Sequence, residues 1–312
     1  MSLTSFIGMK DVNDKIKCLR PKGSRKIGVP LRIESRSDRY SMVGTAFDYL
    51  LRFEIQRRAP YAAVRDWVAE TAANRIFRDD GHVSGGLDLF HGADPKDYLP
   101  PEEISKRAKH IVEKAKAAVT AFCKSKSPDN TMRNDLAAYA ICLANLDVIV
   151  RAGVLDPHFE CADPEDVEDL LEMLSIVPFG DLLDKKSIIL NPAFGDASLL
   201  VGGADADLVS GDLLLDFKVT KKDSMEPKTL DQLLGYFLLW RKERLSNPAL
   251  QEIGRVGLLF ARHGYLWTFD VKEWTEHPEF PEIEQWFFKR ADELNSEIAA
   301  RIAASQKALR RT

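Results

Sequence analysis

Charged side chains interrupt an otherwise apolar segment at residues 203–218. The segment reads GADADLVSGDLLLDFK and contains Asp205, Asp207, Asp216 and Lys218. Its apolar run at residues 213–215 is typical of a buried strand. Charged side chains are rarely fully buried unless they are paired with each other or bound to a metal ion. The segment therefore indicates either a metal site or an Asp–Lys ion pair at the exposed end of a strand.

Strand geometry would bring these side chains together. Side chains alternate between the two faces of a strand, so Asp216 and Lys218 project to the same side. Asp205 and Asp207 share a face of the preceding strand, and a short turn at residues 210–212 can place one or both beside Asp216. Clustered carboxylates repel one another unless a cation joins them, and oxygen ligands favour Mg²⁺ or Mn²⁺. A neighbouring lysine can orient a water molecule or stabilise charge on a phosphate.

The elements that must position these residues follow from the apolar periodicity of the chain. We expect an α/β arrangement with a mixed sheet, because a largely helical region is followed by strands, a helix, a hairpin and a final helix. Residues 1–40 are polar and basic, and we expect an extended or irregular arm there. Helices are predicted at 41–58, 61–78, 101–125, 131–152, from 163–164 onward, at 230–245 and from 281 onward. Strands are predicted at 187–194, 197–209 and 212–220. Residues 255–271 are predicted to form a hairpin that turns at His263 and Gly264.

Composition narrows the class of protein. The chain has 312 residues, a formal net charge of −4 and four widely spaced cysteines, for which we expect reduced thiols rather than a disulfide framework or a zinc site. No apolar run is long enough to span a membrane and the N-terminus lacks the apolar core of a secretory signal, so we expect a cytoplasmic protein. The net charge does not indicate nucleic-acid binding, but local basic stretches could contact phosphates: Arg20, Lys22, Arg25 and Lys26, residues 32–39, and Lys221 with Lys222.

The spacing of these groups resembles that of the PD-(D/E)XK nuclease superfamily, in particular its RecB-like branch. That pattern is an acid on one strand and D/E-x-K on the next, here Asp207 or Asp205 followed by Asp216-Phe217-Lys218. The branch adds Q-x-x-x-Y on the following helix, and this sequence has Gln232 and Tyr236 at that spacing. A separation of four residues places both side chains on one helical face.

A further similarity lies upstream. RecB-like nucleases often carry G-T-x-x-H on a helix before the strands, and residues 44–48 read GTAFD, with Asp48 in place of the metal-binding histidine. Other branches use a glutamate on this helix, so Glu54 is an alternative. Asp48 and Glu54 lie about 240° apart around a helix, so only one is expected to face the site.

The resemblance implies a restriction-endonuclease-like mixed sheet flanked by helices. It divides the chain into a basic arm at 1–40, a nuclease-like domain at 41–280 with a large helical insertion at about 60–180, and a C-terminal helix at 281–312. It implies a Mg²⁺-dependent phosphodiester hydrolase, with Mn²⁺ as a substitute, acting on DNA more readily than RNA. The implied metal ligands are Asp207, Asp216, the Phe217 carbonyl and Asp48, Asp205 or Glu54, with Lys218, Gln232 and Tyr236 completing the catalytic set.

Two alternatives stay open at this stage. A nuclease fold that has lost its activity would serve as a nucleic-acid-binding or scaffold protein, and the histidine replaced by Asp48 leaves room for that. The helical region at 60–178 could also dock a protein partner or a second copy of the chain, which is compatible with either function.

Overall fold

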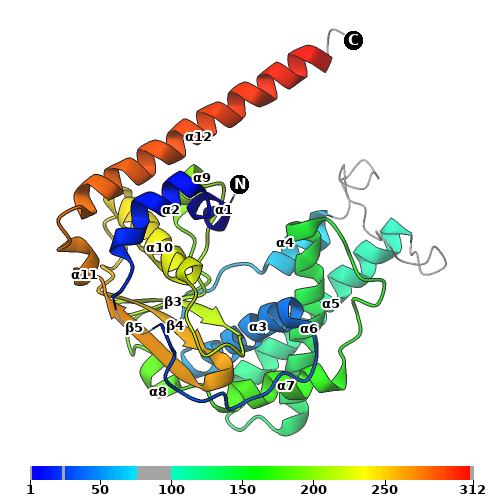
Figure 1. The fold of residues 1–312 in the computed structure, drawn as a ribbon. Coiled ribbons are helices and arrows are strands. Elements are labelled where there is room, and N and C mark those ends of the chain that lie inside the picture. Colours follow the sequence, from blue (N-terminus) through cyan, green and yellow to red (C-terminus); the bar gives the residue numbers. More distant parts are fainter. Residues whose placement is uncertain (1, 23–24, 76–99, 310–312) are drawn as a thin grey trace.

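The computed structural model describes residues 2–22, 25–75 and 100–309, which form a mixed α/β structure around a five-stranded sheet (Figure 1). The strands lie in the order β1-β2-β3-β4-β5, with β3 and β4 parallel and the other neighbours antiparallel. Their bounds are β1 Ile188–Leu190, β2 Leu208–Ser210, β3 Leu213–Lys218, β4 Arg255–Phe260 and β5 Tyr265–Asp270. The prediction of an α/β fold with a mixed sheet is confirmed. Among the described residues, no helix combines the length and apolar character needed to cross a membrane.

Alternation along β3 separates two hydrophobic cores. Leu213 and Leu215 belong to a core shared with one set of helices, and Phe217 packs partly against the same core. Leu214 points the other way, into a second core. The predicted division of this strand into two faces is therefore confirmed, and Asp216 and Lys218 lie on the side of the second core, where the strand ends.

The first core is covered by the helices of the predicted insertion together with the helix that precedes it (Figure 1). The chain enters α6 through Asp129, whose side chain accepts a hydrogen bond from the Met132 N–H, and leaves it at Gly153 in a left-handed conformation with φ 72°. These helices are α3 Tyr40–Arg58, α4 Val68–Arg75, α5 Pro101–Lys124, α6 Asn130–Ala152, α7 Pro164–Ser175 and the short α8 Phe179–Leu182.

One predicted helix begins later than expected. We predicted a helix over 61–78, but α4 begins at Val68, and residues 76–78 lie outside the described residues. Ala63 instead forms a parallel bridge with Ile189 of β1, donating its N–H to the Ile188 carbonyl. This pairing satisfies backbone hydrogen-bonding groups of β1, which is an edge strand. The sequence alone does not show that β1 lies at the edge of the sheet.

The second core contains the N-terminal helices, so the prediction of an extended or irregular arm at residues 1–40 is wrong for residues 3–19. Residues 25–39 are irregular, as predicted. Residues 3–7, 10–16 and 17–19 are helical, and Phe6, Ile7, Val12 and Ile16 are fully buried in this core. Burial of these apolar residues offsets the conformational entropy that a polar segment loses when it becomes ordered. The elements on this side are α1 Leu3–Ile7, α2 Lys10–Ile16, η1 Lys17–Leu19, α9 Gly195–Leu200, α10 Pro227–Ser246, α11 Lys272–Thr275 and α12 Phe280–Leu309. The short η3 Ala261–His263 follows β4, and Ala261 belongs to the first core.

The predicted strand over 197–209 is also wrong for most of its length. Residues 195–200 form α9, and Gly202 and Gly203 then turn the chain with φ values of 77° and 109°, which a side-chain-bearing residue adopts only with strain. Only the last part joins the sheet: Asp205 makes a single bridge to Ala193, and β2 begins at Leu208.

Candidate active site

One cleft of about 670 Å³ brings together most of the residues singled out in the sequence. It opens where β3 ends, between α10 on one side and α3 and α6 on the other (Figure 1). Its lining includes Asp48 from α3, Asp205 and Asp207 from the segment before β2, Asp216, Phe217 and Lys218 from β3, and Gln232 and Tyr236 from α10.

The sheet register sets Asp207 directly against Asp216. Leu208 pairs with Leu215 in the antiparallel ladder, so Asp207 lies opposite Asp216 one step further along. The Phe217 N–H donates to Asp207 Oδ2 at 2.5 Å. Burial, followed by repulsion from Asp216 and Asp48, raises the pKa of Asp207 well above its ordinary value. The Asp207 carboxylate is therefore held in place while its negative charge is disfavoured.

Lys218 occupies the centre of a chain of polar contacts. Its Nζ lies 2.5 Å from Asp216 Oδ2 and donates to Gln232 Oε1 at 3.1 Å. Gln232 Nε2 in turn donates to the Tyr236 hydroxyl oxygen at 2.6 Å. Burial by itself would lower the pKa of Lys218, but the carboxylate of Asp216 outweighs it and leaves that pKa raised. Lys218 is therefore a fixed ammonium ion at neutral pH.

Tyr236 is a neutral hydroxyl in this chain of contacts. Burial, and then the charges of Asp216 and Asp207, raise its pKa well above the usual value. Its ring stacks on Phe194 with centroids 5.4 Å apart, which fixes the position of the hydroxyl. The spacing of Gln232 and Tyr236 on α10 thus has a structural consequence: Tyr236 orients the Gln232 amide, and Gln232 holds Lys218.

Asp48 reaches the cleft from α3 and carries an unsatisfied oxygen. Its Oδ2 accepts from Arg52 Nη2, one helical turn later, while Oδ1 is buried and has no hydrogen-bond partner among the described residues. Burial raises the pKa of Asp48, the Asp205 charge adds to the effect, and Arg52 opposes it. An unpaired buried acceptor costs on the order of 1–3 kcal/mol, which a ligand with positive charge would recover.

A second layer of contacts fixes Arg52 and Asp48. The Arg52 guanidinium lies over the Tyr49 ring at 4.6 Å, and the Tyr49 hydroxyl donates to Asp147 Oδ1 of α6 at 2.8 Å. Asp147 is 2% exposed, and its burial raises the pKa of this carboxyl to about 6. The α3 side of the cleft is thus tied to α6 by a buried polar network.

The cleft fits a hard divalent cation in the chemistry of its donors. The oxygens come from carboxylates, Asp48 Oδ1 lacks a partner, and mutual repulsion raises the pKa of Asp207. Within the described part of the chain, however, no three His, Cys, Asp or Glu side chains are arranged to hold a metal ion. Lys218 pairs with Asp216 and Arg52 with Asp48, so a bound cation would compete with these two ion pairs.

The structure places Glu54 away from the cleft. Its side chain is 1% exposed and pairs with Arg57 at 2.6 Å and Arg58 at 2.7 Å, on the side of α3 that faces α6 and α7. Asp48 and Glu54 lie on different sides of the helix, as their spacing requires, and Asp48 is the one that lines the cleft. Glu54 is therefore removed from the set of candidate metal ligands.

The predicted basic patches are mostly engaged elsewhere. Arg20 forms a two-point ion pair with the buried Asp231, with both contacts at 2.7 Å. Lys22 and Arg25 line a separate small pocket, and Lys26 pairs through its backbone with Ser224. None of these four lines the acidic cleft, whereas Ser2, Leu3 and Thr4 at the start of the same segment do.

Lys221 and Lys222 lie closer to the site. Lys222 pairs with Glu226 on the surface. Lys221 donates to the Tyr40 hydroxyl at 3.3 Å and its Nζ lies 5.0 Å from the centre of the Tyr40 ring, and Tyr40 lines the cleft. Of these two lysines, Lys221 is therefore the one that contacts a residue of the cleft. In the stretch 32–39, Arg36 and Arg39 pair with acids of α7 and its N-cap and do not line the cleft.

Sequence reasoning missed three residues that shape the cleft: Arg52, Tyr40 and Arg151. The spacing of Asp48 and Arg52 by four residues on one helix was a signal for the first of them. Arg151 lies 3.6 Å from Asp147, but its side chain is 61% exposed and also lines the cleft. The contribution of Tyr40 could not be foreseen, because it depends on β3 and α3 meeting in space.

No protein-family model, curated protein or solved structure matches this chain. The likeness to a nuclease therefore extends over short segments only. The functional interpretation depends on the geometry of the cleft.

Proposed function

We propose that this protein is a metal-dependent nuclease with a restriction-endonuclease-like fold of the PD-(D/E)XK, RecB-like type, hydrolysing phosphodiester bonds in DNA rather than RNA. The observation that carries the proposal is the meeting of Asp207, Asp216 and Lys218 in one cleft, with Gln232 and Tyr236 behind Lys218. The five-stranded mixed sheet supports it, because β2 and β3 present these groups from adjacent strands. We propose a cytoplasmic location, where Mg²⁺ and nucleic acid are both present.

Asp207, Asp216 and the Phe217 carbonyl, joined by Asp48, are the groups that would hold Mg²⁺ or Mn²⁺. Such an ion, when bound, polarises the scissile phosphate and lowers the pKa of an attacking water. Asp205 is exposed at the rim of the cleft and is placed to bind the ion through water rather than directly. Burial and repulsion among the carboxylates raise the pKa values of Asp207 and Asp48 without a cation, so binding of the ion would lower both pKa values.

Lys218 is a charged donor in the metal-free protein. Burial lowers its pKa, but the neighbouring carboxylates, Asp216 first, raise it, so the ammonium is protonated at neutral pH. It can donate hydrogen bonds to a phosphate oxygen or to the attacking water, stabilising negative charge as the phosphorus gains a fifth ligand. Gln232, oriented by Tyr236, limits the positions that the ammonium can take.

Positive side chains around the mouth of the cleft suit a phosphate backbone. Arg151 lies on the α6 side, and Lys221 lies near Tyr40 at the N-terminus of α3. Arginine and lysine contacts to phosphates supply sequence-independent affinity that falls with salt. The helical region could in addition dock a protein partner or a second copy of the chain. Such docking is independent of the proposed hydrolysis.

A second candidate function, binding of nucleic acid without cleavage, is favoured by one observation. Lys218 and Arg52 neutralise Asp216 and Asp48 within the protein itself, so the acidic groups can be satisfied without a metal ion. A retired nuclease would keep such internal pairs and lose specific uptake of divalent ions.

The two candidates differ in cleavage and in metal binding. The test incubates the full chain with linear duplex DNA, circular duplex DNA, single-stranded DNA and RNA, each with Mg²⁺, Mn²⁺ or EDTA. Nuclease function predicts cleavage of at least one DNA form that EDTA abolishes, and saturable calorimetric uptake of Mg²⁺ or Mn²⁺. Binding to DNA without cleavage and without metal uptake would establish the second candidate instead.

A further inference from the structure

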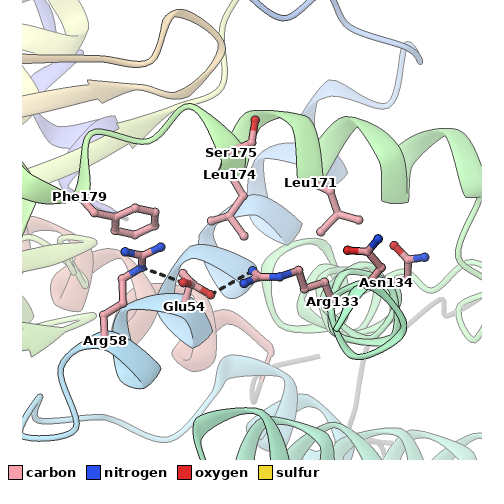
Figure 2. A pocket seen from close by; sticks show the side chains of 9 residues that line it. Glu54, Arg58, Arg133, Asn134, Leu171, Leu174, Ser175 and Phe179 are labelled. Carbon is pink, nitrogen blue, oxygen red and sulfur yellow. Dashed lines mark hydrogen bonds and ion pairs between the residues drawn. The ribbon is translucent and has the colours of Figure 1, made fainter. Parts of the chain in front are cut away.

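A second concave site lies on the opposite side of α3, between α3, α6 and α7 (Figure 2). It encloses about 520 Å³, within the range of ordinary small-molecule sites. Its lining includes Glu54, Arg58, Arg133, Asn134, Leu171 and Phe179, none of which lines the acidic cleft. The site is therefore separate from the proposed nuclease centre.

The site holds a surplus of positive charge. Glu54 is 1% exposed and is approached by Arg58 at 2.7 Å, Arg57 at 2.6 Å and Arg133 at 3.5 Å. One carboxylate thus faces three guanidinium groups, which leaves two positive charges without a countercharge within this cluster. Arg57 does not line the pocket and already donates to both oxygens of Glu54, so Arg58 and Arg133, which do line it, exceed a single two-point pair.

The guanidinium groups keep donors available to a ligand. Arg58 contacts Glu54 through Nε, and within the described residues no hydrogen bond from its two terminal nitrogens is recorded. Arg133 reaches Glu54 only through Nη1. Figure 2 shows these two arginines on opposite sides of Glu54, with Phe179 beside Arg58 and Leu171 and Leu174 on α7 above them. Arg58 lies over the Phe179 ring at 3.9 Å, which restricts its movement.

We infer that this pocket binds a small organic phosphate with a flat ring, such as a nucleoside monophosphate. Two arginines can be satisfied together by the three terminal oxygens of a phosphate, whereas a carboxylate has two. Leu171, Leu174 and Phe179 offer an apolar wall for a ring, and the Asn134 amide can donate to and accept from its polar edge. The inference does not depend on the nuclease activity of the other cleft.

Calorimetric and thermal-shift titrations test this inference with adenosine 5′-monophosphate, adenosine and inorganic phosphate as probes. They are run in EDTA, so that no divalent ion attracts phosphate to the acidic cleft. We expect the monophosphate to bind saturably and raise the Tm, inorganic phosphate to bind at least tenfold more weakly, and adenosine to have no effect. No binding of the monophosphate, or equal binding of inorganic phosphate, would overturn the inference.

Substitutions in the pocket test whether the monophosphate binds there. Arg133→Gln should weaken monophosphate binding about tenfold, since a hydrogen bond to a charged group contributes about 1.5 kcal/mol or more. Arg107→Gln on α5 is the matched control: it removes the same charge from a half-exposed arginine that pairs with Glu103 and Glu160, and it should leave binding within twofold. Leu171→Glu, which places a negative charge on the apolar wall, should also weaken binding and serves if Arg133→Gln does not fold. Unchanged affinity in the folded variants would contradict the assignment of this pocket.

Discussion

At the scale of single residues, the cleft is defined by acids whose charge is disfavoured. Burial and the neighbouring carboxylates raise the pKa of Asp207, and Asp48 keeps one buried oxygen without a partner in the described chain. Such an arrangement costs stability unless a cation is bound. Active sites commonly sacrifice stability in this way for function.

The first prediction concerns Asp207→Asn in the absence of metal. The pKa of Asp207 is higher in the folded than in the unfolded protein, so the folded state binds this proton more tightly, and the contribution of Asp207 to stability is lost as pH rises above its unfolded value. Asparagine keeps an acceptor for the Phe217 N–H and removes the charge. We expect the variant in EDTA at neutral pH to be more stable by on the order of 1 kcal/mol.

Thermal unfolding with and without Mg²⁺ measures both consequences of this change. Mg²⁺ should raise the Tm of the natural protein and have little effect on Asp207→Asn. The stability difference between the two proteins in EDTA should shrink as pH falls toward 4. A variant less stable than the natural protein in EDTA at neutral pH would show that Asp207 is not repelled by its neighbours.

At the scale of secondary structure, short sequence spacings explain most of the site. The i, i+2 spacing in β3 and the i, i+4 spacings on α3 and α10 are local, so Asp216 with Lys218 and Gln232 with Tyr236 could be placed on common faces from the sequence. The meeting of α10 with β3 is tertiary, and the resemblance supplied it. The path of residues 195–207 could not be predicted, because two glycines turn a segment whose apolar residues also suit a strand.

The N-terminal segment was mispredicted for a different reason. Its helices α1 and α2 are 5 and 7 residues long, too short to be stable alone. They form because Phe6 packs on Phe287 of α12, with ring centroids 5.0 Å apart, and Leu3 contacts Gly235 of α10. That stabilisation comes from elements more than 200 residues away, and no local pattern indicates it.

The second prediction tests the role of α10 in holding Lys218. Tyr236→Phe removes the acceptor for Gln232 Nε2 and frees the amide to rotate away from Lys218. Loss of one neutral hydrogen bond is worth about 1 kcal/mol, so cleavage should slow by about five- to tenfold with little change in substrate affinity. Single-turnover cleavage measures this effect, with Tyr139→Phe on α6, outside the cleft, as the control. Equal rates in both variants would remove Tyr236 from the proposed catalytic set.

At the scale of the whole molecule, the cleft forms only if the two hydrophobic cores on opposite faces of the sheet keep fixed positions relative to each other (Figure 1). A buried ion pair fastens α7 to η3, which follows β4: Arg262 of η3 donates to both oxygens of Asp169 on α7, at 2.8 and 2.6 Å. The side chains are 1% and 0% exposed. Arg262 also donates to the Glu34 carbonyl, which fastens the segment leading into α3.

The third prediction concerns this ion pair. Arg262→Met leaves the Asp169 carboxylate buried without its partner, which should cost about 3–5 kcal/mol of the free energy of unfolding. Arg255→Met in β4 is the control, since Arg255 and Asp212 form a half-exposed pair at 2.7 Å that is worth at most about 1 kcal/mol. Urea denaturation of both variants gives the comparison, and a loss of less than about 1 kcal/mol in Arg262→Met would mean that the pair does not hold α7 against η3.

The most direct measurement of the central claim is Mg²⁺-dependent cleavage of DNA by the natural protein and by Asp216→Asn, Lys218→Met and the exposed control Lys228→Met. The account predicts that the natural protein and the control cleave alike, while the two cleft variants fold normally and lose at least about a hundredfold in rate. Full activity in Asp216→Asn and Lys218→Met would contradict it. Failure of the folded natural protein to cleave any form of DNA with Mg²⁺ or Mn²⁺ would contradict it equally.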